Sequence, residues 1–332
     1  MSEDAEPASA GGEEAVAAGS AVRGPFVPLV ELTTTMSAET ALRTIHRKLL
    51  DRIHENVDGV EQRLVGEYLH DFRVAVRRTR TALRQLKGVY PKKTASRFSA
   101  EFGWLSKLTS PARDLEVYLD SLAEYREALG NRIGDPLDPF VAFLREHEDR
   151  ERSACSVGLR SQRYRTLVTE WESFLRPPAD EDPRPGRASR PVDKLAAKSI
   201  RRAYRRVVKR GSTLAVSSPA PAFHKLRLDF KKLRYLLEFF GSLFEQAHVE
   251  DAVNTLRRTQ DSLGKINDLR VQAEWLRAYS GPATDAVSYL ESYIRDQQRG
   301  EREIFLDDFD LFLAADSDGA IDPVIRCLTT AD

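Results

Sequence analysis

Cysteine is scarce in this sequence: Cys155 and Cys327 are the only two in 332 residues. They stand in no CxxC or other ligand spacing, so the sequence indicates neither a disulfide framework nor a zinc site. Two isolated thiols are typical of a reducing compartment, and we expect a cytoplasmic protein without a metal or cofactor.

Long apolar runs are also absent. No stretch approaches the roughly 20 apolar residues that cross a bilayer, so we expect no membrane partner. The N-terminus, MSEDAEPASAGGEEAVAAGS, is acidic and lacks the basic start of a secretory signal. We interpret residues 1–36 as a disordered acidic tail.

The chain has no excess of charge of either sign, because 51 Lys and Arg balance 51 Asp and Glu. This balance excludes a whole-molecule attraction to nucleic acid or to a membrane surface. Any anion site must therefore come from local segregation of the basic residues.

Alternation with period two, which would indicate strands, does not persist anywhere. Apolar residues instead recur at helical spacing, as at Ile45, Leu49 and Ile53, and Ser37 can cap the helix that contains them. We predict an all-α fold. The Pro-rich segment RPPADEDPRPGRASRP at 176–191 is a predicted linker between halves 37–175 and 192–315, and residues 316–332 form a C-terminal tail.

The two halves repeat one another. HDFRVAVRRTRTALRQL begins at His70 and HKLRLDFKKLRYLLEFF at His224, an offset of 224 − 70 = 154. The same offset takes Asp114 in ARDL to Asp268 in INDL, which we interpret as equivalent helix starts. We infer an internal duplication.

Each copy of the repeat has a basic stripe opposite an apolar face. On a helix, His70 and four arginines lie within an arc of about 80°, and Phe72, Val76 and Leu83 lie on the far side. A third basic helix, KSIRRAYRRVVKR, precedes the second copy and contains no acid. The basic candidates are His70, Arg73, Arg77, Arg78, Arg80, Arg84, Lys198, Arg202, Arg205, Arg206, Lys209, His224, Arg227, Lys231, Lys232 and Arg234.

Like charges spaced one helical turn apart repel each other by a few tenths of a kcal/mol per pair. A bound anion would relieve this repulsion, whereas solvated helix faces are the alternative interpretation. Guanidinium groups match phosphate oxygens, and a linear polyanion could contact several turns at once. The second stripe differs from the first at Glu238, which occupies the position equivalent to Arg84. We therefore expect the two halves to bind the anion unequally.

The paired HxxRxxx(R/K)(R/K)xR helices and the later Asp-Leu segments resemble the CHAD family over about residues 37–315. The resemblance implies two pseudo-symmetric four-helix bundles, polyphosphate binding in a basic groove or pore between them, association with polyphosphate granules and no catalysis. It also implies that Asp114 and Asp268 orient arginines. Ser110 departs from the glycine that the family often has, present here as Gly264, which leaves the turn before Asp114 in doubt.

No catalytic motif accompanies these helices: GxxxxGK[ST], GxGxxG, HExxH, GxSxG and ExExK are all missing. We therefore expect a non-catalytic polyphosphate-binding protein of unknown oligomeric state. Two alternatives stay open. A nucleic-acid-binding protein would use the same helices, but no aromatics interleave the stripes for base stacking. A granule scaffold would bind a protein partner with little dependence on salt.

Overall fold

The computed structural model describes residues 27–64, 67–130, 135–176, 186–282 and 285–317. Within these ranges the fold is helical and contains no strand, which confirms the all-α prediction. The helices are α1 (Ala38–Glu61), α2 (Tyr68–Gln85), α3 (Lys92–Leu129), η2 (Asp135–Leu137), α4 (Asp138–Leu159), α5 (Gln162–Leu175), α6 (Val192–Gly211), α7 (Ala220–Phe240), η3 (Gly241–Leu243), α8 (Gln246–Ala278) and α9 (Asp285–Ser317).

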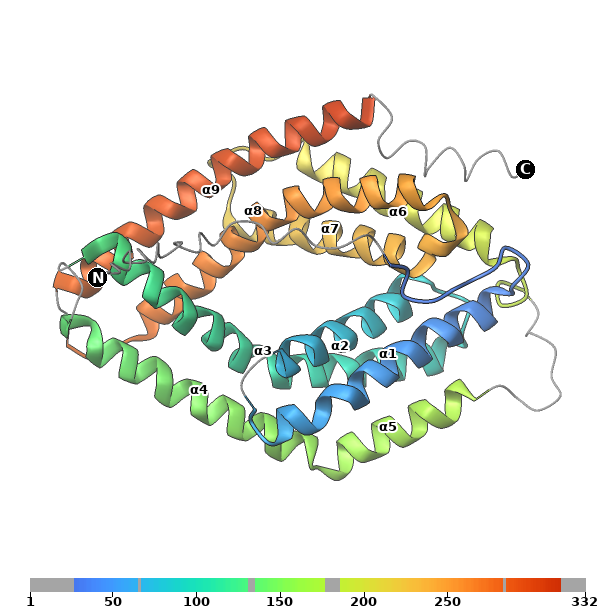
Figure 1. The fold of residues 1–332 in the computed structure, drawn as a ribbon, viewed down its shortest axis with the longest axis horizontal. Coiled ribbons are helices and arrows are strands. Elements are labelled where there is room, and N and C mark those ends of the chain that lie inside the picture. The colour runs from blue at the N-terminus through green and yellow to red at the C-terminus, as the bar shows by residue number, and fades with distance from the viewer. Residues whose placement is uncertain (1–26, 65–66, 131–134, 177–185, 283–284, 318–332) are drawn as a thin grey trace, which may run out of the picture.

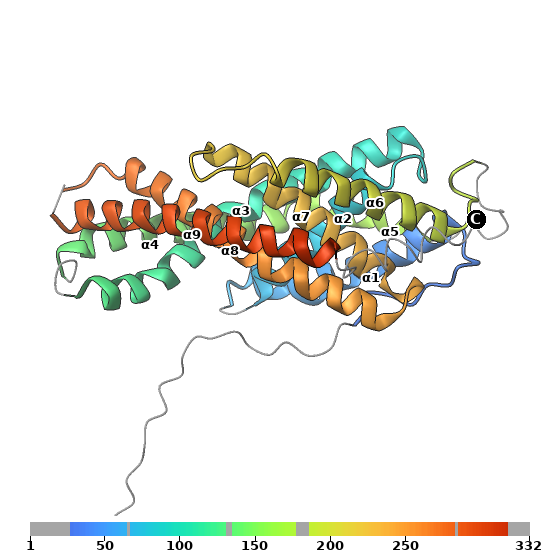
Figure 2. The ribbon, with the colours of Figure 1, turned by 90° about the horizontal axis from the view of Figure 1, so that it is seen from above.

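The molecule is elongated, and the helices of the two sequence halves lie along its two long sides (Figure 1). α1, α2 and α5 lie on one side, and α6, α7 and α9 lie on the other. The long helices α3 and α8 run through the main body and continue to one end, where α4 and α9 lie beside them (Figure 2). Side chains of all four helices form a separate apolar cluster there, with Tyr118, Phe140, Leu276 and Leu290 among its buried members.

The larger apolar core runs through both halves and is dense in aromatic rings. Trp171 of α5 is fully buried and lies 4.5 Å from Phe98 and 4.9 Å from His46, measured between ring centroids. His46 lies 3.0 Å from the Tyr90 hydroxyl through Nδ1. Burial lowers the pKa of His46 to about 3, so this histidine is a neutral part of the core.

The helix positions are compatible with an internal duplication. α6 begins 192 − 38 = 154 residues after α1, and α8 begins 246 − 92 = 154 residues after α3. Two backbone hydrogen bonds between the halves follow the same offset. Ala38 N–H donates to Arg190 O (2.8 Å), and Val192 N–H donates to Met36 O (3.0 Å). Each of these two bonds maps onto the other at the offset of 154, as a pseudo-two-fold axis requires.

The first half differs from the expected four-helix bundle by one helix. α9 is continuous, whereas α4 ends at Leu159 and Ser161 caps the start of α5 by accepting from Tyr164 N–H. Two basic residues of α1 bind the other end of α5: Arg43 donates to Phe174 O and Arg47 donates to Leu175 O (2.8 Å). Cations at the carbonyl end of a helix satisfy its free acceptors and its dipole.

The segment directly before α1 is packed against the rest of the protein, although we expected it to be disordered. Residues 27–36, which we predicted as part of a disordered tail, pack against the second half: Leu29 N–H donates to Glu238 O, and Leu32 is buried. Residues 1–26, the linker residues 177–185 and the tail residues 318–332 lie outside the described residues. In the parts that the structure describes, no helix is long and apolar enough to span a membrane.

The aromatic core supplies a stability prediction. We expect Trp171→Ala to lower the free energy of unfolding by about 3–5 kcal/mol, because it leaves a large cavity among five rings. Urea denaturation followed by circular dichroism measures the change. Trp104→Ala, at a partly buried position, is the matched control, and an equal loss in both variants would contradict the assignment of Trp171 to the centre of the core.

Candidate anion site

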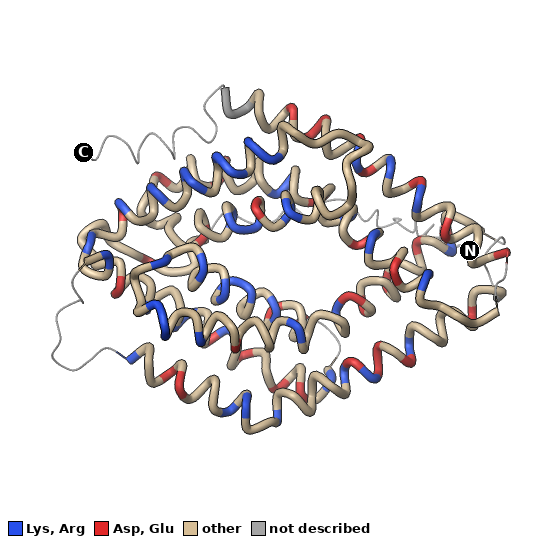
Figure 3. Tube along the Cα trace, turned by 180° about the vertical axis from the view of Figure 1, so that it is seen from behind, with Lys and Arg blue, Asp and Glu red and all other residues tan. Residues whose placement is uncertain are grey.

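α2 and α7 face each other in the middle of the molecule, and the packing of their apolar faces determines this orientation. Phe72, Val76 and Leu83 of α2 are buried in the core, as are Phe230 and Leu233 of α7. The opposite face of each helix, which carries the basic stripe, therefore points out of its own half. Figure 3 shows Lys and Arg positions along the facing stretches of the two helices.

A cavity of about 680 Å³ lies between α2, α6, α7 and the segment before α6. Among the residues that the structure describes, eighteen line the cavity; twelve of these are basic, and none is acidic. The basic residues are Arg77, Arg80, Arg84, Lys87, Arg187, Arg190, Lys194, Lys198, Arg202, Arg206, Lys231 and Lys232; the others are Thr81, Gln85, Leu195, Ser199, Leu228 and Tyr235. Eight of the sixteen basic candidates from the sequence thus line one cavity.

Several of these cations have no carboxylate partner in the part of the chain that the structure describes. Arg80, Arg84 and Lys231 take part in no ion pair there, and the Nε of Arg80 is buried without a hydrogen-bond acceptor. Burial lowers the pKa of Lys231 well below its usual value, and Arg227, Arg77 and Arg234 lower it further. Burial and the neighbouring Arg84 likewise lower the pKa of Arg80.

Two buried carboxylates neutralise some of the predicted binding residues. Asp229 contacts Lys232 (2.8 Å) and Arg206 (3.9 Å), and also pairs with Arg210. Glu238 contacts Arg78 (2.5 Å) and Arg234 (3.4 Å). Lys232 and Arg206 still line the cavity, whereas Arg78 and Arg234 lie outside its lining.

Asp114 and Asp268 lie among the arginines next to the cavity, but not at helix starts as we had predicted. Asp114 is in the middle of α3 and Asp268 in the middle of α8, and the turn expected before Asp114 does not exist, because α3 continues through Ser110 and Pro111. Burial raises the pKa of Asp114; Arg73 opposes this shift, and Asp268 adds to it. The two carboxylates therefore lie close to each other and to Arg73.

Neither motif histidine lines the cavity. His224 is half-buried, and its Nδ1 lies 3.0 Å from Oδ1 of Asn267. His70 is exposed and lies near Arg113, the residue equivalent to Asn267. Partial desolvation and the Arg113 charge lower the pKa of His70, so it is neutral at neutral pH. Arg73 and Arg227 also lie behind the cavity lining, beside Asp114 and Asp268.

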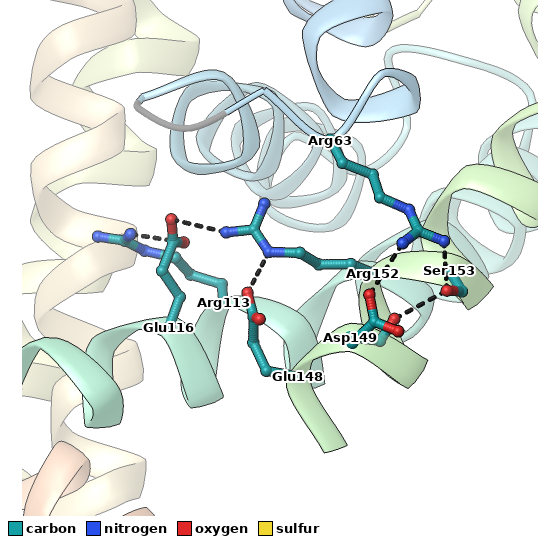
Figure 4. Close-up of polar contacts among 7 residues, drawn as sticks. All are labelled: Arg63, Arg113, Glu116, Glu148, Asp149, Arg152 and Ser153. Atoms are coloured by element: carbon teal, nitrogen blue, oxygen red, sulfur yellow. Dashed lines mark hydrogen bonds and ion pairs between the residues drawn. The ribbon is translucent and has the colours of Figure 1, made fainter. Parts of the chain in front are cut away.

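Beyond the cavity, cations and carboxylates alternate. Arg113 pairs with Glu116 (2.7 Å), which also contacts Arg152 (3.1 Å), and Arg152 pairs with Glu148 (Figure 4). Arg63 pairs with Asp149 (2.9 Å) in the same region. The α3–α4 side of the molecule therefore matches its charges, in contrast to the cavity.

The cavity lining overlaps the predicted binding residues only in part: eight of the sixteen basic candidates line it, and four further cations of the lining were not among the candidates. The candidates outside the lining are His70, Arg73, Arg78, Arg205, Lys209, His224, Arg227 and Arg234. Arg205 and Lys209 are exposed on α6 outside the cavity lining. The missed cations are Lys87, Arg187, Arg190 and Lys194. Among the described residues, no group of three or more His, Cys, Asp and Glu side chains could hold a metal ion.

Comparison with known proteins agrees with this geometry. The family profile of the CHAD domain matches residues 44–277. The chain belongs to the CHAD family. Members of this family are known in general for polyphosphate binding and are not known as catalytic domains.

Two solved structures resemble this CHAD chain. The crystal structure of the CHAD domain from the plant Ricinus communis is 26% identical, with a TM-score of 0.72, over 88% of this chain and 97% of that one. PptA from Streptomyces chartreusis is 15% identical, with a TM-score of 0.66, over 83% of this chain and 100% of that one, and shows the fold alone. No curated protein sequence matches the chain.

The depressed pKa of Lys231 gives a prediction for the ligand-free CHAD chain. Between the folded and unfolded pKa values of Lys231, the unfolded state binds more protons, so stability rises with pH. We expect Lys231→Met to increase the free energy of unfolding at about pH 7. We also expect that this free energy increases less between about pH 7 and about pH 10 in the variant than in the wild type. Urea denaturation at both pH values measures this, with Lys225→Met, at an exposed position, as the control. A destabilised Lys231→Met protein would contradict the unpaired state of the amine.

Proposed function

We propose that this protein binds inorganic polyphosphate, without converting it, in the cavity between α2, α6 and α7. One observation carries the proposal: of the described residues, twelve cations line the cavity and no carboxylate does. Holding these charges together is unfavourable in the absence of a ligand, and a polyanion supplies the missing negative charge.

The arrangement of the cations suits a linear phosphate polymer. Lys194, Lys198, Arg202 and Arg206 follow one another on α6 at intervals of four residues, or about 6 Å. Arg77, Arg80 and Arg84 form a second row on α2, and Lys231 of α7 lines the same cavity. A flexible chain of phosphoryl groups can contact both rows, whereas a single phosphate would leave most of the cations unneutralised.

The same lining argues against catalysis and against nucleic acid. In the described part of the chain it contains no histidine or carboxylate that could act as a general base. Tyr235 is its only aromatic residue, and this ring is 1% exposed, so bases would find no stacking surface. We extend the proposal to association of the protein with polyphosphate granules in the cytoplasm.

Loss of two cavity cations tests the site. We expect Arg80→Gln combined with Arg202→Gln to weaken binding of a long polyphosphate on the order of 100-fold. We also expect the slope of log K against log salt to become shallower by about two, because two phosphate contacts are removed. Isothermal titration at several salt concentrations measures both quantities.

The matched control is Arg163→Gln combined with Arg295→Gln, which removes two exposed arginines far from the cavity. It should leave affinity and slope unchanged, and circular dichroism should show full helicity in both double variants. Equal weakening in the two double variants would indicate nonspecific charge attraction and would overturn the proposed site.

Competition separates polyphosphate from nucleic acid. Because the cavity contacts phosphates and offers no stacking surface, polyphosphate should displace single-stranded DNA at equal phosphate concentration. Fluorescence anisotropy of labelled DNA follows the displacement. DNA that displaces bound polyphosphate under the same conditions would favour the nucleic-acid alternative.

A further inference from the structure

Arg77 and Lys231 both line the cavity and are related to each other by the offset of 154, whereas the positions related to the other ten lining cations carry much less positive charge. In chain order, these ten cations map onto Arg234, Glu238, Gly241, Thr33, Met36, Thr40, Thr44, Lys48, Arg52 and Arg78. Four of these ten positions are basic and one is acidic. The duplicated fold thus has one strongly basic side and one that has lost most of its excess charge.

Glu238 is the acidic replacement, and it is buried at 7% exposure where α2 meets α7. It contacts Arg78 at 2.5 Å and Arg234 at 3.4 Å. Both guanidinium groups lie over the ring of Tyr235, at 5.5 Å and 5.6 Å from its centroid. Tyr235 lines the cavity, so the Glu238 cluster (Arg78, Arg234, Tyr235 and Glu238) reaches the cavity through Tyr235, and its three charged members lie outside the lining.

Other residues on the related side form hydrogen bonds and ion pairs within the protein. Thr40 and Thr44 stand where α6 has Lys194 and Lys198, and their hydroxyls bond to Ser37 and to the Thr40 carbonyl. Arg52, related to Arg206, pairs with Glu55 at 3.0 Å. The N-terminal segment also crosses this side, because Leu29 N–H donates to Glu238 O.

We propose that Glu238 is a specificity-determining residue that confines the polyphosphate to one side of the molecule by neutralising Arg78 and Arg234. This inference rests on the proposed function. For a phosphate chain bound between α2, α6 and α7, the row of available cations ends at the Glu238 cluster, because Glu238 already neutralises Arg78 and Arg234. Each protein therefore holds one segment of polymer, and the related side takes none.

Removal of the Glu238 charge tests this assignment. Glu238→Gln keeps the size of the side chain and frees two guanidinium groups beside the cavity wall. We expect tighter binding of long polyphosphate, on the order of tenfold, and a salt slope steeper by about one to two. The number of phosphoryl residues bound per protein at saturation should rise. Isothermal titration with chains of defined length gives all three quantities.

Arg78→Gln provides the second arm. In the wild-type background it should leave the salt slope unchanged, because Glu238 already neutralises Arg78. In the Glu238→Gln background it should remove a large part of the gain. Glu101→Gln frees Arg163 on a remote surface (2.8 Å pair) and is the matched control, with no expected change.

Two results would overturn the inference: an unchanged slope in Glu238→Gln, or a loss in Arg78→Gln alone as large as that in Arg80→Gln. If Glu238→Gln does not fold, as judged by circular dichroism, the Arg78→Gln arm decides on its own. The proposed function fails separately, if the Arg80 and Arg202 substitutions leave polyphosphate binding intact.

Discussion

Mutual repulsion among cations held in a partly buried cavity is the interaction on which this structure depends. In bulk water such repulsion is weak, but burial reduces screening and strengthens it. The chain does not lack carboxylates to relieve it, since Asp and Glu equal Lys and Arg in number. Glu116, Glu148 and Asp149 neutralise arginines on the α3–α4 side, and Asp229 and Glu238 do so at the margins of the cavity. Arg80, Arg84 and Lys231, which line the cavity, have no such partner among the described residues.

The fold supplies the rigidity that this separation of charge requires. α2 and α7 each bury an apolar face in the main core, so their basic faces cannot rotate away from one another. The second apolar cluster joins α3, α4, α8 and α9 at the far end and holds the long helices in place. The paired hydrogen bonds between Ala38 and Arg190 and between Val192 and Met36 fix the starts of α1 and α6. They also bring the cations that precede α6 to the rim of the cavity.

The helical period was enough to predict the all-α fold and the stripes on α2, α6 and α7, because the apolar faces of amphipathic helices determine which way the basic faces point. Pairings between distant residues were not predictable: Glu238 lies 160 residues from Arg78, and only packing brings them together. Arg187 and Arg190 were missed because they follow a Pro-rich segment without periodicity. Asp114 and Asp268 were misplaced because each Asp-Leu pair suggests a helix start, whereas Pro111 and Gly264 are accommodated inside continuous helices.

A crystal structure of the protein with a short linear polyphosphate tests the central claim most directly. Our account predicts phosphoryl groups inside the cavity, with oxygen atoms about 2.7–3.2 Å from the nitrogen atoms of Arg80, Arg202 and Lys231. It also predicts that the Glu238 cluster keeps its ion pairs in the complex. Phosphoryl groups bound to the exposed Arg205 and Lys209, with the cavity cations left without contacts to the polymer, would contradict it.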